Sequence, residues 1–285
     1  MGKRKSRKDD NGDTNMDDSD SSDMETVNVD FEWFDPQPKV DFHGLKTLLR
    51  QLLDVDAQIF NLSALADIIL SQPLLGSTVK VDGNETDPYA FLTVLNLHEH
   101  KDKEVVKDLL AYIHKKASKN TKLDPLFDLL SSREVPQIGL ILTERLLNIP
   151  AQVVPPMYTM LQEEIGWALE EGEPYKFTHY LVLSKIYLEV ESKLDQEDNR
   201  PSKKKKKAPG NNETFYFHPE DEILEQHSIC YGSYEYSHSE ADGASDSKRA
   251  FQELGIKPQG EMILIDAAKF EEATKALSQF VNAQS

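Results

Sequence analysis

The sequence lacks the residues on which several common protein chemistries depend. Cys230 is the only cysteine in 285 residues, which excludes an internal disulfide and argues against a thiolate zinc site. None of the 13 glycines forms a G-x-G pair, so the dinucleotide-binding and phosphate-loop fingerprints are missing. No apolar run approaches the length of a membrane span, and the N-terminus has no secretory h-region. We therefore expect a protein without a membrane span in a reducing compartment, the cytosol or the nucleus.

Basic side chains are scarce in two tracts of the C-terminal half. Residues 213–246 hold nine carboxylates and no lysine or arginine, and residues 151–198 hold ten carboxylates against three lysines. These two acidic tracts contribute −9 and −7 to the formal net charge of −18. A field of one sign attracts basic partners and repels nucleic acid and anionic membranes. The charge distribution thus favours a basic protein partner and disfavours direct contact with nucleic acid.

Aromatic residues are interleaved with the acids of residues 213–246. Some of these aromatics fit the core-facing side of strands, with the acids pointing to water. That interpretation leaves unexplained the absence of lysine and arginine over 34 residues, because ordinary surfaces mix both signs. An exposed ion pair contributes only about 0.2–1 kcal/mol to binding, so charge alone gives weak binding. We therefore expect the charge to speed association and exposed tyrosines to add selectivity. The predicted partner-binding residues are Glu220, Asp221, Glu222, Glu225, Tyr231, Tyr234, Glu235 and Tyr236.

Two segments are poor in apolar residues. Residues 1–26 contain no apolar cluster, and residues 191–214 contain one leucine and no aromatic residue, which is typical of disorder. We predict a disordered basic-then-acidic tail over 1–26 and a disordered insertion over 191–214, in one folded domain made of 27–190 and 215–285. The insertion carries five consecutive lysines: Lys203, Lys204, Lys205, Lys206 and Lys207. For these lysines we favour recognition by import receptors over contact with nucleic acid, because acidic tracts surround them.

Hydrophobic periodicity predicts alternating strands and helices. Val27, Val29, Phe31 and Trp33 alternate with polar residues, which indicates a half-buried strand, and Asp41 is placed to cap a helix with an apolar stripe. Further strands are predicted at 78–81, 90–97, 138–143, 177–190, 215–217, 229–236 and 261–266, and further helices at 63–70, 104–118, 124–131, 157–170 and 267–281. The helix at 157–170 should have an acidic outer face. This order predicts an α/β or α+β domain with helices packed on a single sheet.

Three stretches resemble a known family. VNVDFEWFDPQPKVDFHGLKTLLRQLLD (27–54), LTERLLNIPAQVVPPMY (142–158) and FYFHPEDEIL (215–224), together with the lysine insertion, are similar to sequences of the BCCIP family of eukaryotic nuclear proteins. Length and insertion resemble the fungal branch, which is linked to nuclear export and to chaperoning of a large-subunit ribosomal protein. The resemblance implies a GNAT-like core, an acetyltransferase-like mixed sheet flanked by helices that does not bind acetyl-CoA. It also implies a phosphoinositide kinase among the exported cargo.

The residues that follow the strand at 138–143 depart from the acetyltransferase pattern. Those enzymes hold the cofactor pyrophosphate on the backbone amides of a glycine-rich loop beside a helix N-terminus. Residues 143–150 (TERLLNIP) contain no glycine, and Pro150, Pro155 and Pro156 have no amide N–H. Glu144 adds a negative charge that only Arg145 opposes. No cofactor loop is therefore predicted, and no cofactor is expected.

Histidine and cysteine offer few other sites. His98 and His100 share one face of an extended segment but lack a third ligand nearby. His227 and Cys230 form half of a zinc-like pair without a second cysteine. A nucleophilic Cys230 needs basic neighbours, and its surroundings are acidic. We predict no metal, no catalytic residue, and a partly buried structural thiol at Cys230.

The sequence thus predicts a non-enzymatic nuclear adaptor or chaperone that shuttles to the cytoplasm. Its carboxylates would take the place of ribosomal RNA phosphates around a newly made ribosomal protein of the large subunit. Two alternatives stay open: a divergent acyltransferase, and a scaffold in DNA repair or cell-cycle control.

Overall fold

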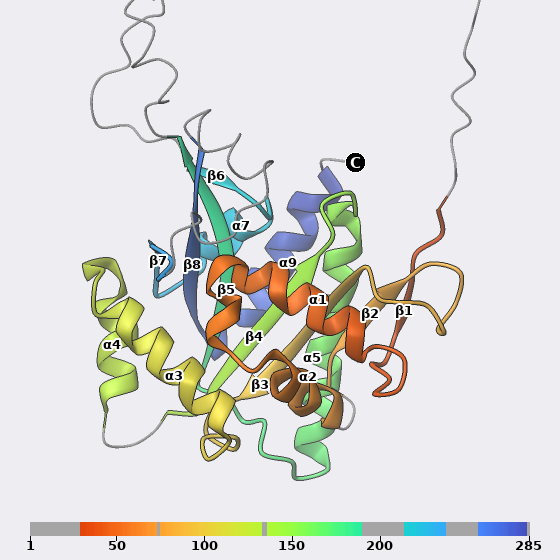
Figure 1. The fold of residues 1–285 in the computed structure, drawn as a ribbon, viewed down its shortest axis with the longest axis horizontal. Coiled ribbons are helices and arrows are strands. Elements are labelled where there is room, and N and C mark those ends of the chain that lie inside the picture. Colours follow the sequence, from red (N-terminus) through yellow and green to blue (C-terminus); the bar gives the residue numbers. More distant parts are fainter. Residues whose placement is uncertain (1–28, 73–74, 133–135, 190–213, 238–255, 284–285) are drawn as a thin grey trace, which may run out of the picture.

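The computed structural model describes residues 29–72, 75–132, 136–189, 214–237 and 256–283 (Figure 1). The predicted tail over 1–26 lies outside these residues, and so does the predicted insertion over 191–214 apart from Thr214. The lysines at 203–207 therefore have no structural description, and their import role stays a prediction.

A mixed sheet of eight strands forms the centre of the molecule. Its strands are β1 (Glu32–Phe34), β2 (Ser77–Lys80), β3 (Ala90–Asn96), β4 (Ile138–Arg145), β5 (His179–Glu189), β6 (Thr214–Tyr216), β7 (Cys230–Tyr234) and β8 (Ile256–Asp266). The order is β1-β2-β3-β4-β5-β8-β7, and β6 pairs with β5 off this path. Only β4 and β5 run parallel, whereas the other pairs are antiparallel. The predicted single α/β domain with helices on one sheet is confirmed.

Helices cover both faces of this sheet (Figure 1). One apolar cluster joins the sheet to α1 (Phe42–Leu53), α2 (Leu62–Ser71), α3 (Glu104–Ala117) and α4 (Asp124–Ser131). A second cluster on the opposite face contains α5 (Val154–Glu170) and α9 (Ala267–Ala283), with Leu224 of the short helix α7 (Asp221–Gln226). The stripe of α1 shows why the helices pack this way, because Leu45, Leu48, Leu49 and Leu52 fall on one face and are all buried.

Three local predictions were wrong, each for a physical reason. Asp41 precedes α1 but its side chain makes no cap; it accepts a hydrogen bond from Gln37 N at 2.6 Å and pairs with buried Lys80 at 2.6 Å. Helix α5 begins at Val154 rather than Met157, because its two prolines occupy the first turn, where no intrahelical N–H bond is required. Helix α7 was not predicted, since six residues are too short to show a helical period.

Strands β4 and β5 separate partway along their length. Their pairing covers only Ile138–Ile141 of β4 against His179–Val182 of β5. Further along, β6 pairs with Ile186–Leu188 of β5, while β8 follows the other side of β5 from end to end. The polypeptide that follows β6 therefore enters the fold where the two parallel strands diverge.

Candidate functional site

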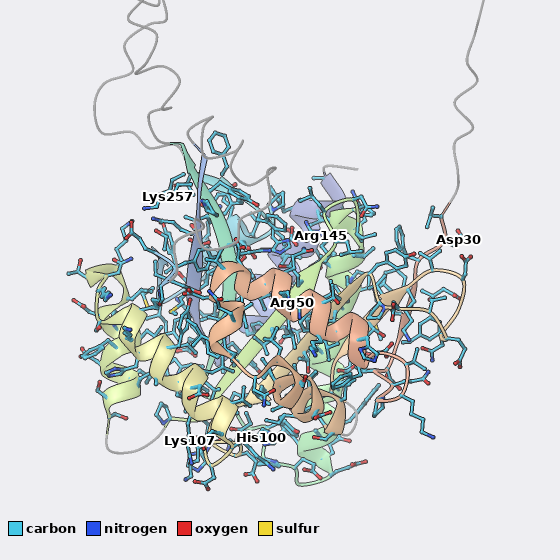
Figure 2. All side chains as sticks on the ribbon, viewed as in Figure 1. Asp30, Arg50, His100, Lys107, Arg145 and Lys257 are labelled. Atoms are coloured by element: carbon cyan, nitrogen blue, oxygen red, sulfur yellow. The ribbon has the colours of Figure 1, made fainter. Side chains whose placement is uncertain are left out.

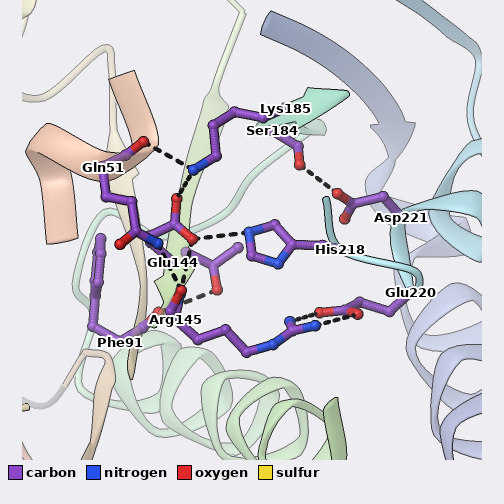
Figure 3. A network of polar contacts seen from close by, with 10 residues as sticks. Gln51, Phe91, Glu144, Arg145, Ser184, Lys185, His218, Glu220 and Asp221 are labelled. Atoms are coloured by element: carbon purple, nitrogen blue, oxygen red, sulfur yellow. Dashed lines mark hydrogen bonds and ion pairs between the residues drawn. The ribbon is translucent and has the colours of Figure 1, made fainter. Parts of the chain in front are cut away.

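A buried ionic network lies where β4 and β5 separate, and Figure 3 shows it at close range. At its centre is Glu144 near the end of β4, only 1% exposed. Its Oε2 is 2.6 Å from Lys185 Nζ of β5, and its Oε1 is 3.0 Å from His218 Nε2, just after β6. Lys185 Nζ also donates to Gln51 O of α1 at 2.9 Å. One carboxylate thus connects both diverging strands, the segment after β6 and a covering helix.

Electrostatics favour the ionised form of Glu144. Burial opposes it, but the hydrogen bond with His218 and the charge of Lys185 hold the pKa of Glu144 below its usual value. The Phe217 ring also stabilises the charge of Lys185 through a cation–π contact, with 3.9 Å between Nζ and the ring centroid.

A second pair ties α7 to the end of β4. Arg145 binds both carboxylate oxygens of Glu220, with 3.1 Å between Nη2 and Oε2, and both side chains are buried. Figure 2 shows Arg145 in the body of the fold, whereas Lys257, the partner of exposed Glu235, lies at the periphery. Next to Glu220, Asp221 accepts a hydrogen bond from Ser184 Oγ of β5. Burial raises the pKa of Asp221 to about 7 against the attraction of His218.

Two further carboxyl groups adjoin this network. Glu225 of α7 accepts a hydrogen bond from Tyr216 Oη at 3.0 Å, and Glu261 of β8 is buried beside it. Burial raises the pKa of Glu261 to about 9, with Glu225 and Asp221 adding to the effect, and burial also raises the pKa of Glu225. These acids hold α7 against the sheet and add little negative charge to the outer surface.

The predicted partner-binding residues therefore divide into two groups. Four of them are buried in the fold, so their predicted exposure was wrong: Glu220, Asp221, Glu225 and Tyr234. Helix α7 turns its carboxylates toward Arg145, Ser184 and Tyr216, partners supplied by distant parts of the chain. Of the other four, Glu222, Tyr231 and Glu235 are exposed and Tyr236 is partly buried. A partner-binding role for these four stays a prediction.

Within the two acidic tracts, most of the exposed acids that the structure describes lie on α5 and just beyond it. Glu163, Glu170, Glu171 and Glu173 are exposed, and none forms an ion pair with another residue that the structure describes. The predicted acidic outer face of this helix is thus present. The sequence prediction missed its apolar component, Trp167 and Leu169, which are 54% and 42% exposed. Helical spacing of Trp167 from the acids was the signal that could have revealed it.

The arrangement has little of what an acetyltransferase-type site requires. Glu144 and Arg145 continue β4, whereas the predicted strand ended at residue 143, and α5 opens with two prolines that have no N–H. Within the described ranges, no three His, Cys, Asp or Glu side chains form a group suited to a metal ion. Cys230 is buried, and burial raises its thiol pKa. Among the helices that the structure describes, none is long and apolar enough to cross a membrane.

Several known proteins from fungi are similar to this chain. The BCCIP family profile matches residues 26–224. A protein named bcp1 from Aspergillus fumigatus is 65% identical over 287 residues, covering 99% of each chain. Another bcp1, from Schizosaccharomyces pombe, is 51% identical and covers 92% of this chain and 93% of its own. The crystal structure of BCP1 from Saccharomyces cerevisiae matches with a TM-score of 0.62 at 25% identity, covering 94% of this chain and 97% of that one. None of these names specifies a catalytic activity.

Proposed function

The chain belongs to the BCCIP family, and from this membership we propose that it is a non-enzymatic nuclear adaptor and chaperone. It binds and shields a basic client, a ribosomal protein of the large subunit, and supports the nuclear export of cargo such as a phosphoinositide kinase. The lysines at 203–207 deliver it to the nucleus.

The unpaired carboxylates on and just after α5 carry this proposal. Many other acids are neutralised inside the fold by the chain's own bases, as in the pairs Glu144–Lys185 and Glu220–Arg145. The α5 acids lie at the surface and have no counterion among the described residues. A surface of this kind attracts a cationic protein over distances of about 8–10 Å at physiological salt. It also competes with RNA for the basic side chains of the client.

The gap between the diverging ends of β4 and β5 is filled by the chain's own segment from β6 to α7, and this filled strand gap supports the non-enzymatic part of the proposal. We propose that the domain is a GNAT-like fold, in which the separation of the two parallel strands corresponds to the cofactor-binding position. Here the segment from β6 to α7 occupies that position and is held there by the contacts of His218 with Glu144 and of Glu220 with Arg145. Opening the gap for a cofactor would break buried ion pairs, which is strongly unfavourable.

Binding to purified large-subunit ribosomal proteins at increasing salt tests the proposal. A triple variant, Glu163→Gln, Glu170→Gln and Glu171→Gln, removes three exposed charges from α5. A matched control, Asp67→Asn, Asp108→Asn and Asp128→Asn, removes three exposed charges from the helices on the other face. We expect client affinity to fall with salt, and to fall at least about threefold in the α5 variant but not in the control. Equal affinity from 50 to 300 mM salt, or equal losses in the two variants, would contradict the proposal.

A further inference from the structure

Trp167 is placed in an unusual environment for an exposed aromatic residue. It lies one turn before the end of α5 and is 54% exposed. Glu163, Glu170 and Glu171 stand at positions i−4, i+3 and i+4 from it, so their Cβ atoms lie about 5–6 Å from that of Trp167 on the same helix surface. Leu169 is also exposed, but its spacing of two residues from Trp167 places it on a different side of the helix.

The end of α5 is electrostatically unfavourable as it stands. A helix C-terminus carries a partial negative charge and is stabilised by basic side chains in its last turn. The last turn of α5 contains no basic residue, and Glu170 belongs to it with Glu171 at the cap. Lys176 is the nearest basic residue in the sequence, and it forms no ion pair with these acids in the part of the chain that the structure describes. A cation from another molecule would therefore relieve repulsion at this end.

The backbone holds this group of side chains in place. Gly172 has φ +82°, and the N–H groups of Gly172 and Glu173 donate to Leu169 O and Ala168 O at 3.1 and 2.9 Å. This pair of hydrogen bonds forms a Schellman motif at the helix C-terminus, and glycine adopts its left-handed backbone conformation without strain. Trp167 and its acids are thus presented on a fixed helix end rather than on a loose loop.

We propose that Trp167, Glu163, Glu170 and Glu171 form a binding site for an arginine side chain of a basic partner segment. The guanidinium stacks on the indole ring while its N–H groups bond the glutamates. Arginine fits better than lysine, because its planar group stacks on aromatic rings and bonds carboxylates in pairs. The inference rests on the proposed binding of a basic client and adds the residue type that anchors it.

A single exposed aromatic residue needs no special explanation in most proteins. Here three features point to a cation: an indole face open to solvent, carboxylates on the same helix surface that have no counterion among the described residues, and a helix C-terminus without a base in its last turn. The site also lies far from the filled strand gap. In Figure 1 the C-terminal end of α5 is at the bottom of the view, whereas β6 and α7 are at the top.

Fluorescently labelled hexa-arginine and hexa-lysine peptides test the inference by anisotropy on the full chain at 150 mM salt. The variants are Trp167→Ala, Trp167→Phe and, as a matched exposed apolar control, Leu147→Ala, whose side chain is 81% exposed. Wild type should bind hexa-arginine about two- to fivefold more tightly than hexa-lysine. Trp167→Ala should lose this preference, Trp167→Phe should keep part of it, and Leu147→Ala should keep it all.

A second measurement reports on the indole itself. The chain has two tryptophans, and Trp33 donates its indole N–H to Val153 O at 3.1 Å. In Trp33→Phe, Trp167 is the only tryptophan, and hexa-arginine should change the tryptophan emission with the affinity seen by anisotropy. Unchanged emission, together with equal affinity of Trp167→Ala and wild type for both peptides, would overturn the arginine site.

The two proposals fail in different ways. If the α5 triple variant binds both peptides more weakly and Trp167→Ala binds both as tightly as wild type, the acidic surface binds basic partners without an aromatic anchor. In that case only the arginine site is refuted. If neither the triple variant nor Trp167→Ala alters binding of either peptide, α5 is not the basic-partner surface and both proposals are refuted.

Discussion

Replacing Glu220 by glutamine should lower the free energy of unfolding by about 3 kcal/mol. The reason is the environment of Arg145, whose guanidinium is buried and bound to both oxygens of the Glu220 carboxylate. Glutamine leaves that guanidinium without its counterion, and breaking a buried pair from one side costs about 3–5 kcal/mol. We take the lower end because the glutamine oxygen still accepts one hydrogen bond. For a domain of this size the melting temperature should fall by roughly 6–12 °C.

Urea unfolding followed by far-UV circular dichroism at pH 7.5 measures this loss. Glu222→Gln is the matched control, since it removes the same charge from an exposed position of α7 and should change stability by less than about 0.5 kcal/mol. The double variant Arg145→Met, Glu220→Leu replaces the whole pair by apolar side chains and should recover most of the stability. If Glu220→Gln is as stable as Glu222→Gln, then Glu220 is not held in a buried pair, and its role as a surface acid would have to be reconsidered.

Three other predictions concern proton binding, cofactor binding and transport. Burial raises the pKa of Glu164 from 4.5 to about 7, so between these values the folded protein keeps a proton that the unfolded chain has lost. The free energy of unfolding should therefore fall with rising pH, by about 1–2 kcal/mol from pH 6 to 8.5 relative to Glu164→Gln. Urea unfolding at each pH measures this, and the same pH dependence of the unfolding free energy in both proteins would disprove it. Calorimetry with acetyl-CoA should detect no binding, and micromolar affinity would restore the acyltransferase alternative. Replacing Lys203–Lys207 by alanine should reduce nuclear accumulation of a fluorescent fusion, a prediction that fails if the distribution is unchanged.

The helices and strands were largely predictable because their signals are local. The leucine stripe of α1 and the apolar strands β3, β4 and β5 have periods that a short window of sequence reveals. The predicted boundaries of β4 and β8 were too short. Glu144 and Arg145 continue β4, and Ile256–Gly260 begin β8, although these residues do not look like a buried strand. Long-range pairing with β3 and β5 extends these strands, and no local pattern records it.

The placement of the acids could not be predicted from the sequence. Glu220 meets Arg145 across 75 residues, and Lys185 meets Gln51 across 134. A count of charges along the chain treats Glu220 and Glu222 alike, although one is buried in an ion pair and the other is exposed. The orientation of α7 decides which acids are buried, because it turns Asp221 and Glu225 toward the sheet and Glu222 toward solvent. The acidic face of α5 was predictable because a 17-residue helix shows its own period.

The two sets of acids contribute to different properties of the protein. Glu144 and Glu220 have partners inside the fold, so their charges are cancelled at short range, and they fix the β6–α7 segment between the diverging strands. Glu163, Glu170 and Glu171 have no such partners among the described residues, so no neighbouring base cancels their charges and only solvent and salt screen them. Neutralising the first set should therefore reduce stability and leave the salt dependence of client binding unchanged. Neutralising the second should weaken binding, and should slightly stabilise the domain because it removes repulsion at the C-terminus of α5. A surface kept at a small cost in stability is what selection for a cationic partner would produce.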